Sequence, residues 1–290
     1  MLNVYEQVDQ NKRRSTLIIV LFFIFFLTIG YLLSVYFGSN NNFIVYALLI
    51  SLFSTLVSYF KGDQIILALN RAKPTDRKTY FNYYTVVENL SLASQIPMPK
   101  IYFIDSPALN AFATGRDPDH ALVCVTTGLL AKLNRSQLEA VIAHELSHIK
   151  NYDIRLMMIV SLLVGSLSLL IRFGFSSRTG SRKKGGSNPL AIIGVILLIL
   201  SPLIAKLLKL AISRRREFLA DASAVKLTRQ PQNLISALKT ISQDPNVLQS
   251  ASTATASLYI ANPFKNDKIG NLFSTHPPIK KRIEALNQML

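Results

Sequence analysis

The sequence predicts a mainly α-helical membrane protein that carries a smaller α+β domain. Half of the 290 residues are apolar and the mean hydropathy is +0.30, which is high for a water-soluble domain. The apolar residues gather in long uncharged runs, near the N-terminus and again in the middle, and the segments between them mix polar and apolar residues. These observations place part of the chain in a lipid bilayer and part in water.

The N-terminal part is predicted to be a short cytoplasmic segment, residues 1–15, followed by a transmembrane hairpin, residues 16–60. Thr16–Phe37 has no charged residue and is long enough to cross a bilayer, and Phe43–Phe60 is a second uncharged run. No small-residue cleavage site follows the first run, which favours a retained anchor over a signal peptide. Basic residues border both outer ends of the pair, so the positive-inside rule places both in the cytoplasm.

Residues 61–155 are expected to form the first half of a water-soluble α+β domain. Helical periodicity covers Tyr80–Gln95, and a second helix is predicted at Ser136–Asn151, where Ser136 and Glu139 have the spacing of a capping box. Between these helices, short runs rich in β-branched residues predict a small β-sheet. The runs are Lys100–Ile104, Asn110–Thr114 and Ala121–Thr126.

Two further apolar runs, Met157–Ile171 and Leu190–Ala205, form a second membrane region together with their linker, residues 156–211. Each run is shorter than the roughly 20 residues that a transmembrane helix needs. The linker 172–188 is basic and contains no acid, so a full crossing puts it on the side that the positive-inside rule disfavours. A full hairpin and a shallow pair both remain open; we favour the hairpin, which makes four transmembrane helices in all.

Residues 212–290 are expected to complete the water-soluble domain. Arg216–Leu227 and Gln232–Ile241 have helical patterns, and Ile279–Met289 is predicted to be an amphipathic C-terminal helix. Ser250–Thr255 consists of small residues and is expected to be a loop. The chain therefore interleaves two membrane regions with two halves of one domain.

Charge and cysteine usage narrow the class further. The formal net charge is +16, from 32 Lys and Arg against 16 Asp and Glu. The basic residues cluster beside apolar spans, as in Lys12-Arg13-Arg14 and Arg214-Arg215-Arg216, which favours anionic lipid headgroups. No nucleic-acid-binding motif is present, so we expect no nucleic-acid partner. The single cysteine, Cys124, excludes an intramolecular disulfide and is expected to be a small core residue.

The residues with the clearest chemistry are His144-Glu145-Leu146-Ser147-His148. Two histidines four residues apart lie on one helix face, where both imidazoles reach one Zn²⁺. The glutamate between them lies beside such a metal and can take a proton from a metal-bound water. A charged helix carries this short pattern by chance in some proteins. Here the preceding residues are largely apolar, and burying unpaired imidazoles and a carboxylate on such a helix is costly.

A zinc site that activates water needs a third protein ligand and an open position. Glu217 is the candidate, because it begins Glu217-Phe218-Leu219-Ala220-Asp221, an i, i+4 pair of acids on a predicted helix. Asp221, one turn along, is placed to accept the second ring N–H of a ligand histidine. The alternative is that Glu217 is a solvated acid that pairs with neighbouring arginines. The occurrence of the histidine pair in the same chain favours the ligand interpretation.

Taken together, these motifs resemble the HtpX family of bacterial membrane zinc metalloproteases, which are related to the CAAX prenyl proteases. The matching segments are His144–Asp153, Glu217–Asp221 and Ser274-Thr275-His276-Pro277. The resemblance implies a gluzincin-type endopeptidase with one Zn²⁺ per chain, multi-pass in the bacterial cytoplasmic (inner) membrane, with its active site facing the cytoplasm. It also implies polypeptide substrates, namely misfolded or damaged membrane proteins cut in envelope quality control. The oligomeric state is left open.

The resemblance also marks residues outside the ligand set. Asn110-Ala111-Phe112 resembles the edge strand on which gluzincins lay an extended substrate, with Asn110 and Ala111 as substrate-binding residues; the alternative is an ordinary strand with a turn-forming Asn. His276 has two open roles, as a donor to the oxyanion or as a fourth zinc ligand that keeps the enzyme latent. Asn151 and Asp153 match the continuation of the zinc helix, with helix termination and bonding to a ligand both open.

The expected mechanism uses zinc held by His144, His148 and Glu217 to polarise a water and the scissile carbonyl. Glu145 takes the proton of the water and passes it to the leaving amine. An intramembrane site is disfavoured, because charged residues flank the motif within a few positions. A zinc scaffold or chaperone without turnover has no use for Glu145. A basic lipid- or nucleic-acid-binding protein leaves the histidine and acid pairs unexplained.

Overall fold

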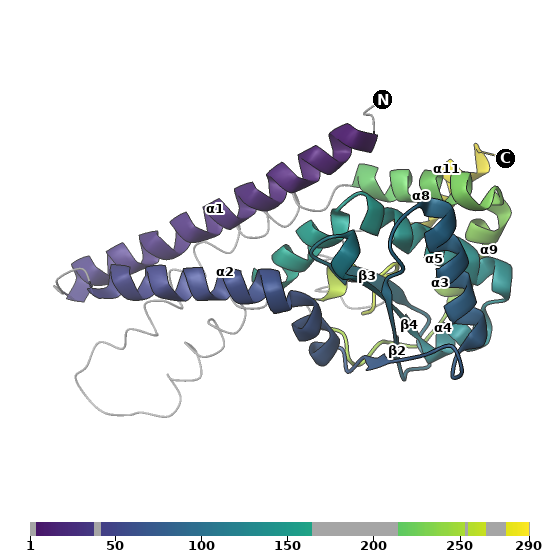
Figure 1. Cartoon of the computed structure of the whole chain (residues 1–290), viewed down its shortest axis with the longest axis horizontal. Coiled ribbons are helices and arrows are strands. Elements are labelled where there is room, and N and C mark those ends of the chain that lie inside the picture. Colours follow the sequence, from purple (N-terminus) through teal and green to yellow (C-terminus); the bar gives the residue numbers. More distant parts are fainter. Residues whose placement is uncertain (1–3, 38–41, 164–213, 253–254, 265–276, 290) are drawn as a thin grey trace.

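The fold consists of two long helices that project from a compact mixed α/β body (Figure 1). The computed structural model describes residues 4–37, 42–163, 214–252, 255–264 and 277–289. The projecting helices are α1 (Val4–Phe37) and α2 (Asn42–Leu69). The body contains the sheet and the remaining helices; we call it the catalytic domain after the role that the sequence analysis expects of its histidine motif.

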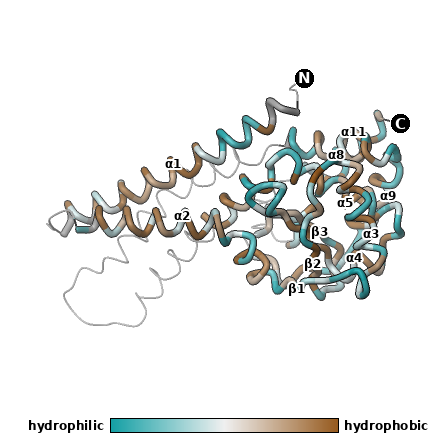
Figure 2. The backbone as a smooth tube through the Cα atoms, viewed as in Figure 1, coloured by the Kyte–Doolittle hydropathy of each residue, from teal (hydrophilic) through white to brown (hydrophobic). Residues whose placement is uncertain are grey.

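Helices α1 and α2 are long and apolar enough to cross a membrane, over Val8–Leu32 and Ile44–Leu69. Figure 2 shows them as mostly hydrophobic along their projecting parts. Many of their large apolar side chains lie on the outside, with Phe53 as much as 70% exposed, while others, such as Phe22, are buried within the protein. Such a surface suits lipid contact and not water. The predicted N-terminal hairpin is therefore present as two candidate spans.

The second predicted membrane region lies mostly beyond the described residues. Residues 153–163 are helical and contain the start of the run Met157–Ile171, whereas Leu190–Ala205 and the linker 172–188 are outside the described ranges. In the described part, Ile154, Leu156 and the following apolar side chains are buried within the protein.

A four-stranded mixed sheet forms the centre of the catalytic domain. The strands are β1 (Lys73–Pro74), β2 (Lys100–Ile104), β3 (Ala111–Gly115) and β4 (Ala121–Thr126). Their order is β1-β2-β4-β3, with β2 and β4 parallel and both outer pairs antiparallel. Strand β3 is therefore an edge strand. The predicted small sheet is confirmed, and β3 begins one residue later than expected.

Side chains alternate between the two faces of the sheet and build two cores. On one face, Ala111, Val123 and Val125 pack with apolar residues of the helices around the zinc motif. On the other face, Phe112 and Cys124 pack with the end of α2. Cys124 is buried, as its apolar surroundings in the sequence predict.

The helices of the catalytic domain surround α5, which carries the zinc motif. They are α3 (Phe81–Ser94), α4 (Thr127–Lys132), α5 (Arg135–Lys150), α8 (Arg214–Thr228), α9 (Pro231–Gln243) and α11 (Ile279–Asn287). Helix α5 contacts α3, α8, α9 and β3, so the motif is enclosed on several sides. This enclosure explains why the motif residues are buried.

The N-terminal cap of α5 differs from the prediction. The capping box is formed by Asn134 and Gln137, each side chain accepting from the backbone N–H of the other, at 2.9 and 3.0 Å. Asn134 has extended backbone, as an N-cap requires, whereas Ser136 already lies inside the helix. Glu139 instead pairs with Arg135 on the helix surface. The helix therefore starts one residue earlier than expected.

The inner end of α2 belongs to the catalytic domain. The helix runs without a break past residue 60 to Leu69, and Ile66 is fully buried in the second core. At Gly62 a Cβ atom would lie 2.8 Å from side-chain atoms of Met158 and Leu162. A larger residue at this position would therefore displace the ends of these two side chains where α2 approaches the helical segment 153–163.

Candidate metal centre

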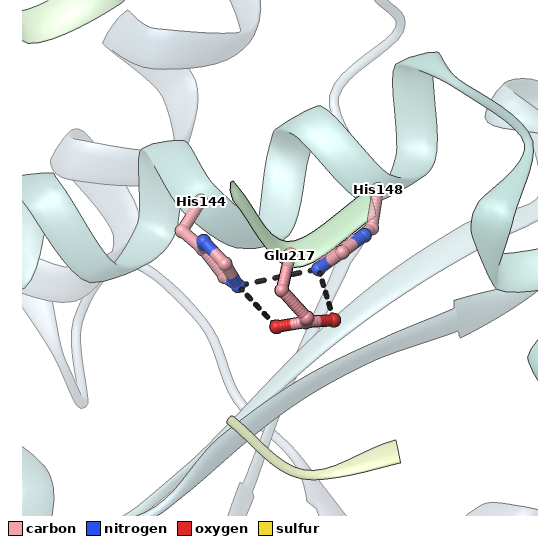
Figure 3. Close-up of side chains that lie close together, drawn as sticks. All are labelled: His144, His148 and Glu217. Atoms are coloured by element: carbon pink, nitrogen blue, oxygen red, sulfur yellow. Dashed lines mark hydrogen bonds and ion pairs between the residues drawn. The ribbon is translucent and has the colours of Figure 1, made fainter. Parts of the chain in front are cut away.

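The two histidines of the motif occupy adjacent turns of α5 and point to the same side (Figure 3). Their Nε2 atoms are 3.2 Å apart, and the rings meet edge to face. Both side chains are buried. Because two neutral imidazoles gain little from such an approach, the arrangement is typical of atoms that share one cation.

Glu217 on α8 completes this cluster from the opposite side (Figure 3). Its Oε2 lies 3.6 Å from Nε2 of His144, and its Oε1 lies 3.6 Å from Nε2 of His148. Ligands about 2.0–2.2 Å from zinc at tetrahedral angles lie about 3.3–3.6 Å apart. The three residues therefore fit a zinc ion, and two nitrogens with one carboxylate are a donor set that zinc prefers.

Asp221 and Arg282 support His144. Nδ1 of His144 donates to Oδ1 of Asp221 at 2.9 Å, so Nε2 is the atom that faces the cluster and offers its lone pair once its proton is displaced. Arg282 grips the same carboxylate with two hydrogen bonds, from Nη2 at 2.6 Å and from Nε at 2.9 Å. Burial is the largest single influence and disfavours the charged form of Asp221, but Arg282 and His144 together outweigh burial and lower the pKa of Asp221 to about 2. Asp221 is therefore ionised and accepts from His144.

The pKa of His144 reflects competition between burial and charge. Burial and the guanidinium of Arg282 both disfavour an imidazolium, but the carboxylates of Asp221 and Glu217 outweigh them and raise the pKa of His144 to about 9. A metal ion at Nε2 must therefore displace a proton at neutral pH.

Arg282 is a functional residue that the sequence analysis missed. It is 0% exposed, reaches in from α11, and lies 3.8 Å from Oε2 of Glu217 while its Nη1 donates to the carbonyl of Ile260. Burial is the largest single influence and disfavours its charge, but the carboxylates of Asp221, Glu217 and Glu145 together outweigh burial and raise the pKa of Arg282. The available signal was its position one turn before the buried Leu286, on the apolar side of an amphipathic helix.

Asp153 supports His148 in a corresponding way. Nδ1 of His148 lies 3.0 Å from Oδ2 of Asp153, five residues along the chain. Asn151 caps the end of α5, and Tyr152 then adopts a left-handed conformation, with φ 60°, which turns the chain back toward the histidine. Of the two roles left open for these residues, Asn151 ends the helix, and Asp153 lies within hydrogen-bond distance of the candidate metal ligand His148.

Glu145 lies next to His144 on α5 and is buried. Its negative charge is among the causes that raise the pKa of Arg282, so the two side chains are close enough to interact. Its carboxylate is therefore part of the charged cluster around the two histidines.

Comparison with known proteins identifies the family. A family model described as peptidase family M48 matches residues 82–290. A protease HtpX homolog of Dictyoglomus turgidum is 43% identical, with 98% of this chain and 94% of the relative covered. Another from Streptococcus thermophilus is 40% identical, with 99% of this chain and 100% of the relative covered. The chain belongs to peptidase family M48.

Among the M48 peptidases, the protease HtpX homologs are therefore full-length relatives of this chain. The crystal structure of S. mikatae Ste24p shares the fold, with a TM-score of 0.51 and 21% identity, and the match covers 97% of this chain and 66% of that one. The M48 assignment and the two apolar helices make this chain a membrane metalloprotease. The resemblance seen in the sequence is confirmed.

Three expected site residues of this M48 chain have other partners or fall outside the described ranges. Asn110 is buried, and its amide donates to the carbonyl of Ala261 at 2.9 Å while its Oδ1 accepts from the N–H of Ala261 at 3.3 Å. The carbonyl of Ala111 accepts from Ile260 at 2.9 Å. The groups expected to bond a substrate are thus engaged within the protein. His276 lies outside the described residues.

Proposed function

We propose that this chain is a gluzincin-type, zinc-dependent endopeptidase. The observation that carries the proposal is the convergence of His144, His148 and Glu217 from two helices onto one point. Each histidine Nδ1 is engaged by a carboxylate, so both Nε2 atoms face the point where a single Zn²⁺ fits. Glu145 is buried beside His144 and is not needed as a ligand.

The proposed chemistry is peptide hydrolysis with Glu145 as general base. Zinc, when bound, supplies Lewis-acid polarisation of a water and of the scissile carbonyl. Glu145 accepts the proton of the attacking water and passes it to the leaving amine. Asp221 and Asp153 hold the two imidazoles in the tautomer that keeps Nε2 unprotonated.

We further propose that the substrate lies along the edge strand β3 as an added strand. The carbonyl of Asn110 accepts from Thr126 of β4, and the carbonyl of Ala111 faces the opposite side, where Ile260 occupies it. Because backbone groups alternate along an antiparallel strand, those of Ala113 face the same outer side as Ala111. In the described residues nothing pairs with Ala113 there, so it replaces Asn110 as the proposed backbone contact.

The proposal also includes the location of the protein in the cell, its orientation in the membrane and its substrates. We place the chain as a multi-pass protein of the bacterial inner membrane, with the catalytic domain, in its halves 61–155 and 212–290, on the cytoplasmic side. The charge distribution supports this side, because Lys12, Arg13 and Arg14 precede the first apolar span and Lys61 follows the second. The proposed substrates are misfolded or damaged membrane proteins in envelope quality control.

The test is zinc content and proteolysis measured on the same detergent-purified samples. Glu145→Gln is expected to keep zinc and lose cleavage of a casein-like substrate, whereas Glu217→Ala is expected to lose zinc. Glu139→Gln is the matched control, since Glu139 lies on the same helix but pairs with Arg135 at the surface. Cleavage at the wild-type rate by Glu145→Gln would overturn the mechanism.

His276 retains its two proposed roles. If it donates to the oxyanion, His276→Ala loses turnover at unchanged zinc content. If it closes the site as a fourth ligand, the same variant gains turnover and binds zinc less tightly. Measuring the two quantities together separates the roles.

A further inference from the structure

The inner end of the first apolar helix lies directly against the metal centre. Asn11 on α1 is only 3% exposed, and Ser15, one turn further along, is also buried. The ammonium of Lys12 lies 4.5 Å above the ring of Tyr152, in the turn that follows the zinc helix. One face of this end of α1 therefore packs on the catalytic domain.

Asn11 makes two specific contacts in this interface. Its Nδ2 donates to the carbonyl of Asn151 at 2.9 Å and to Oδ1 of Asp153 at 2.8 Å. Both amide hydrogens are thus used on the turn that ends α5. Residues 11 and 153 are far apart in sequence, so the contact forms only when α1 is docked.

The second contact leads to a metal ligand. Asp153 is buried, and its other oxygen, Oδ2, lies 3.0 Å from Nδ1 of His148. Arg216 of α8 approaches Oδ1 of the same carboxylate at 3.3 Å. A buried carboxylate with both oxygens engaged has little freedom to rotate, so the orientation of the imidazole depends on the groups that hold Asp153.

We propose that Asn11 is a positioning residue of the metal centre, acting through Asp153 on His148. The apolar helix α1 is then part of the zinc site as well as an anchor, and the site is complete only when the inner end of α1 is docked. This inference rests on the proposed function only in taking zinc as the metal.

The experiment measures zinc affinity of the full-length protein in detergent by competition with a chelator. Asn11→Leu has a similar volume and no donor, and we expect its zinc dissociation constant to rise about three- to tenfold, less than the about 10–100-fold typical of a direct partner of a ligand. Ser15→Ala is the matched control, because the Ser15 hydroxyl bonds only the backbone of its own helix and its zinc affinity should not change. A wild-type zinc affinity in Asn11→Leu would overturn the proposal.

A double-mutant cycle with Asp153→Asn distinguishes positioning from loss of packing. If Asn11 acts through Asp153, Asn11→Leu no longer weakens zinc binding in the Asp153→Asn background. An equal loss in both backgrounds would show that Asn11 acts by another route and would overturn the proposal. Asn11→Ser, which is too short to reach Asp153, repeats the test if Asn11→Leu fails to fold. A wild type that binds zinc but cleaves nothing would contradict the proposed function alone.

Discussion

The two ligand histidines are held by matched but unequal surroundings. Both donate from Nδ1 to a buried aspartate, and an arginine binds each aspartate. On the His144 side, Arg282 is fully buried and bidentate, so the support lies within the catalytic domain. On the His148 side, Arg216 makes one longer contact, and Asn11 of α1 supplies the rest.

The difference shows how one zinc site can depend on two kinds of contact. The His144 side resembles an ordinary buried ion pair, whose strength comes from exclusion of water. On the His148 side, the neutral donor is Asn11 of the apolar N-terminal helix, so this support connects two parts of the molecule. Variants that affect one side at a time test whether this contrast has energetic consequences.

The largest effect is expected for Arg282→Met. Removing the guanidinium leaves the buried, ionised Asp221 with the His144 imidazolium as its remaining cationic partner among the described residues, and breaking a buried ion pair costs about 3–5 kcal/mol. The melting temperature of the metal-free protein should fall by many degrees, and Arg282→Lys should recover part of the loss. An unchanged melting temperature in Arg282→Met would show that His144 alone balances the charge of Asp221.

Replacing each aspartate tests whether the His144 side and the His148 side differ in their effect on zinc affinity. Asp221→Asn and Asp153→Asn each remove a partner of a ligand histidine and should weaken zinc binding by about 10–100-fold. Because Asp221 also holds Arg282 beside Glu217, its replacement should have the larger effect. Chelator competition measures both, and a larger loss in Asp153→Asn would reverse the proposed order.

The pH dependence of zinc binding should follow His144. Its pKa is raised to about 9 from an ordinary 6.5, so below pH 9 a proton competes with the metal. Zinc affinity should therefore rise about tenfold per pH unit from 6.5 toward 9. The same shift stabilises the metal-free protein below pH 6.5, and this contribution is lost as the pH rises through 9.

The control for this pH dependence is Asp221→Asn, in which the imidazolium loses its ionised partner. The rise of affinity should then level off at a lower pH than in the wild type. A wild-type affinity that stays flat between pH 7 and 8.5 would contradict a protonated His144 in the metal-free site.

The smallest effect is expected for Arg216→Met. Arg216 contributes a single hydrogen bond to Asp153, and Asn11 remains in place, so the loss of stability should be about 1–3 kcal/mol at most. Thermal melting beside Arg282→Met measures the difference between the two sides. Equal losses in the two variants would remove the proposed inequality.

The sequence predicted what depends on local pattern. The spacing of His144 and His148 on a helix, the acid pair at Glu217 and Asp221, and the three main strands all follow from short-range periodicity. The N-cap of α5 was predicted at Ser136 and not at Asn134, because both residues are of types that favour the N-cap position. The backbone conformation that selects Asn134 is not visible in composition.

Residues whose role depends on distant packing could not be predicted. Arg282 and Asn11 reach the metal centre from opposite ends of the chain, and neither has a local motif that marks it. Asn110 has the pattern of a substrate-binding edge strand, yet the segment 260–261 occupies its side chain. In each case the deciding partner is at least 61 residues away in the sequence.

The buried thiol of Cys124 gives this protein a built-in reporter. It is the only cysteine, and burial raises its pKa well above the usual range, so alkylating reagents should react with it slowly in the native state. It lies in the core that also contains Ile66 from the inner end of α2. If the inner end of α2 moves away from this core, the thiol of Cys124 should become accessible. The rate at which Cys124 is alkylated should therefore report that movement without an introduced probe.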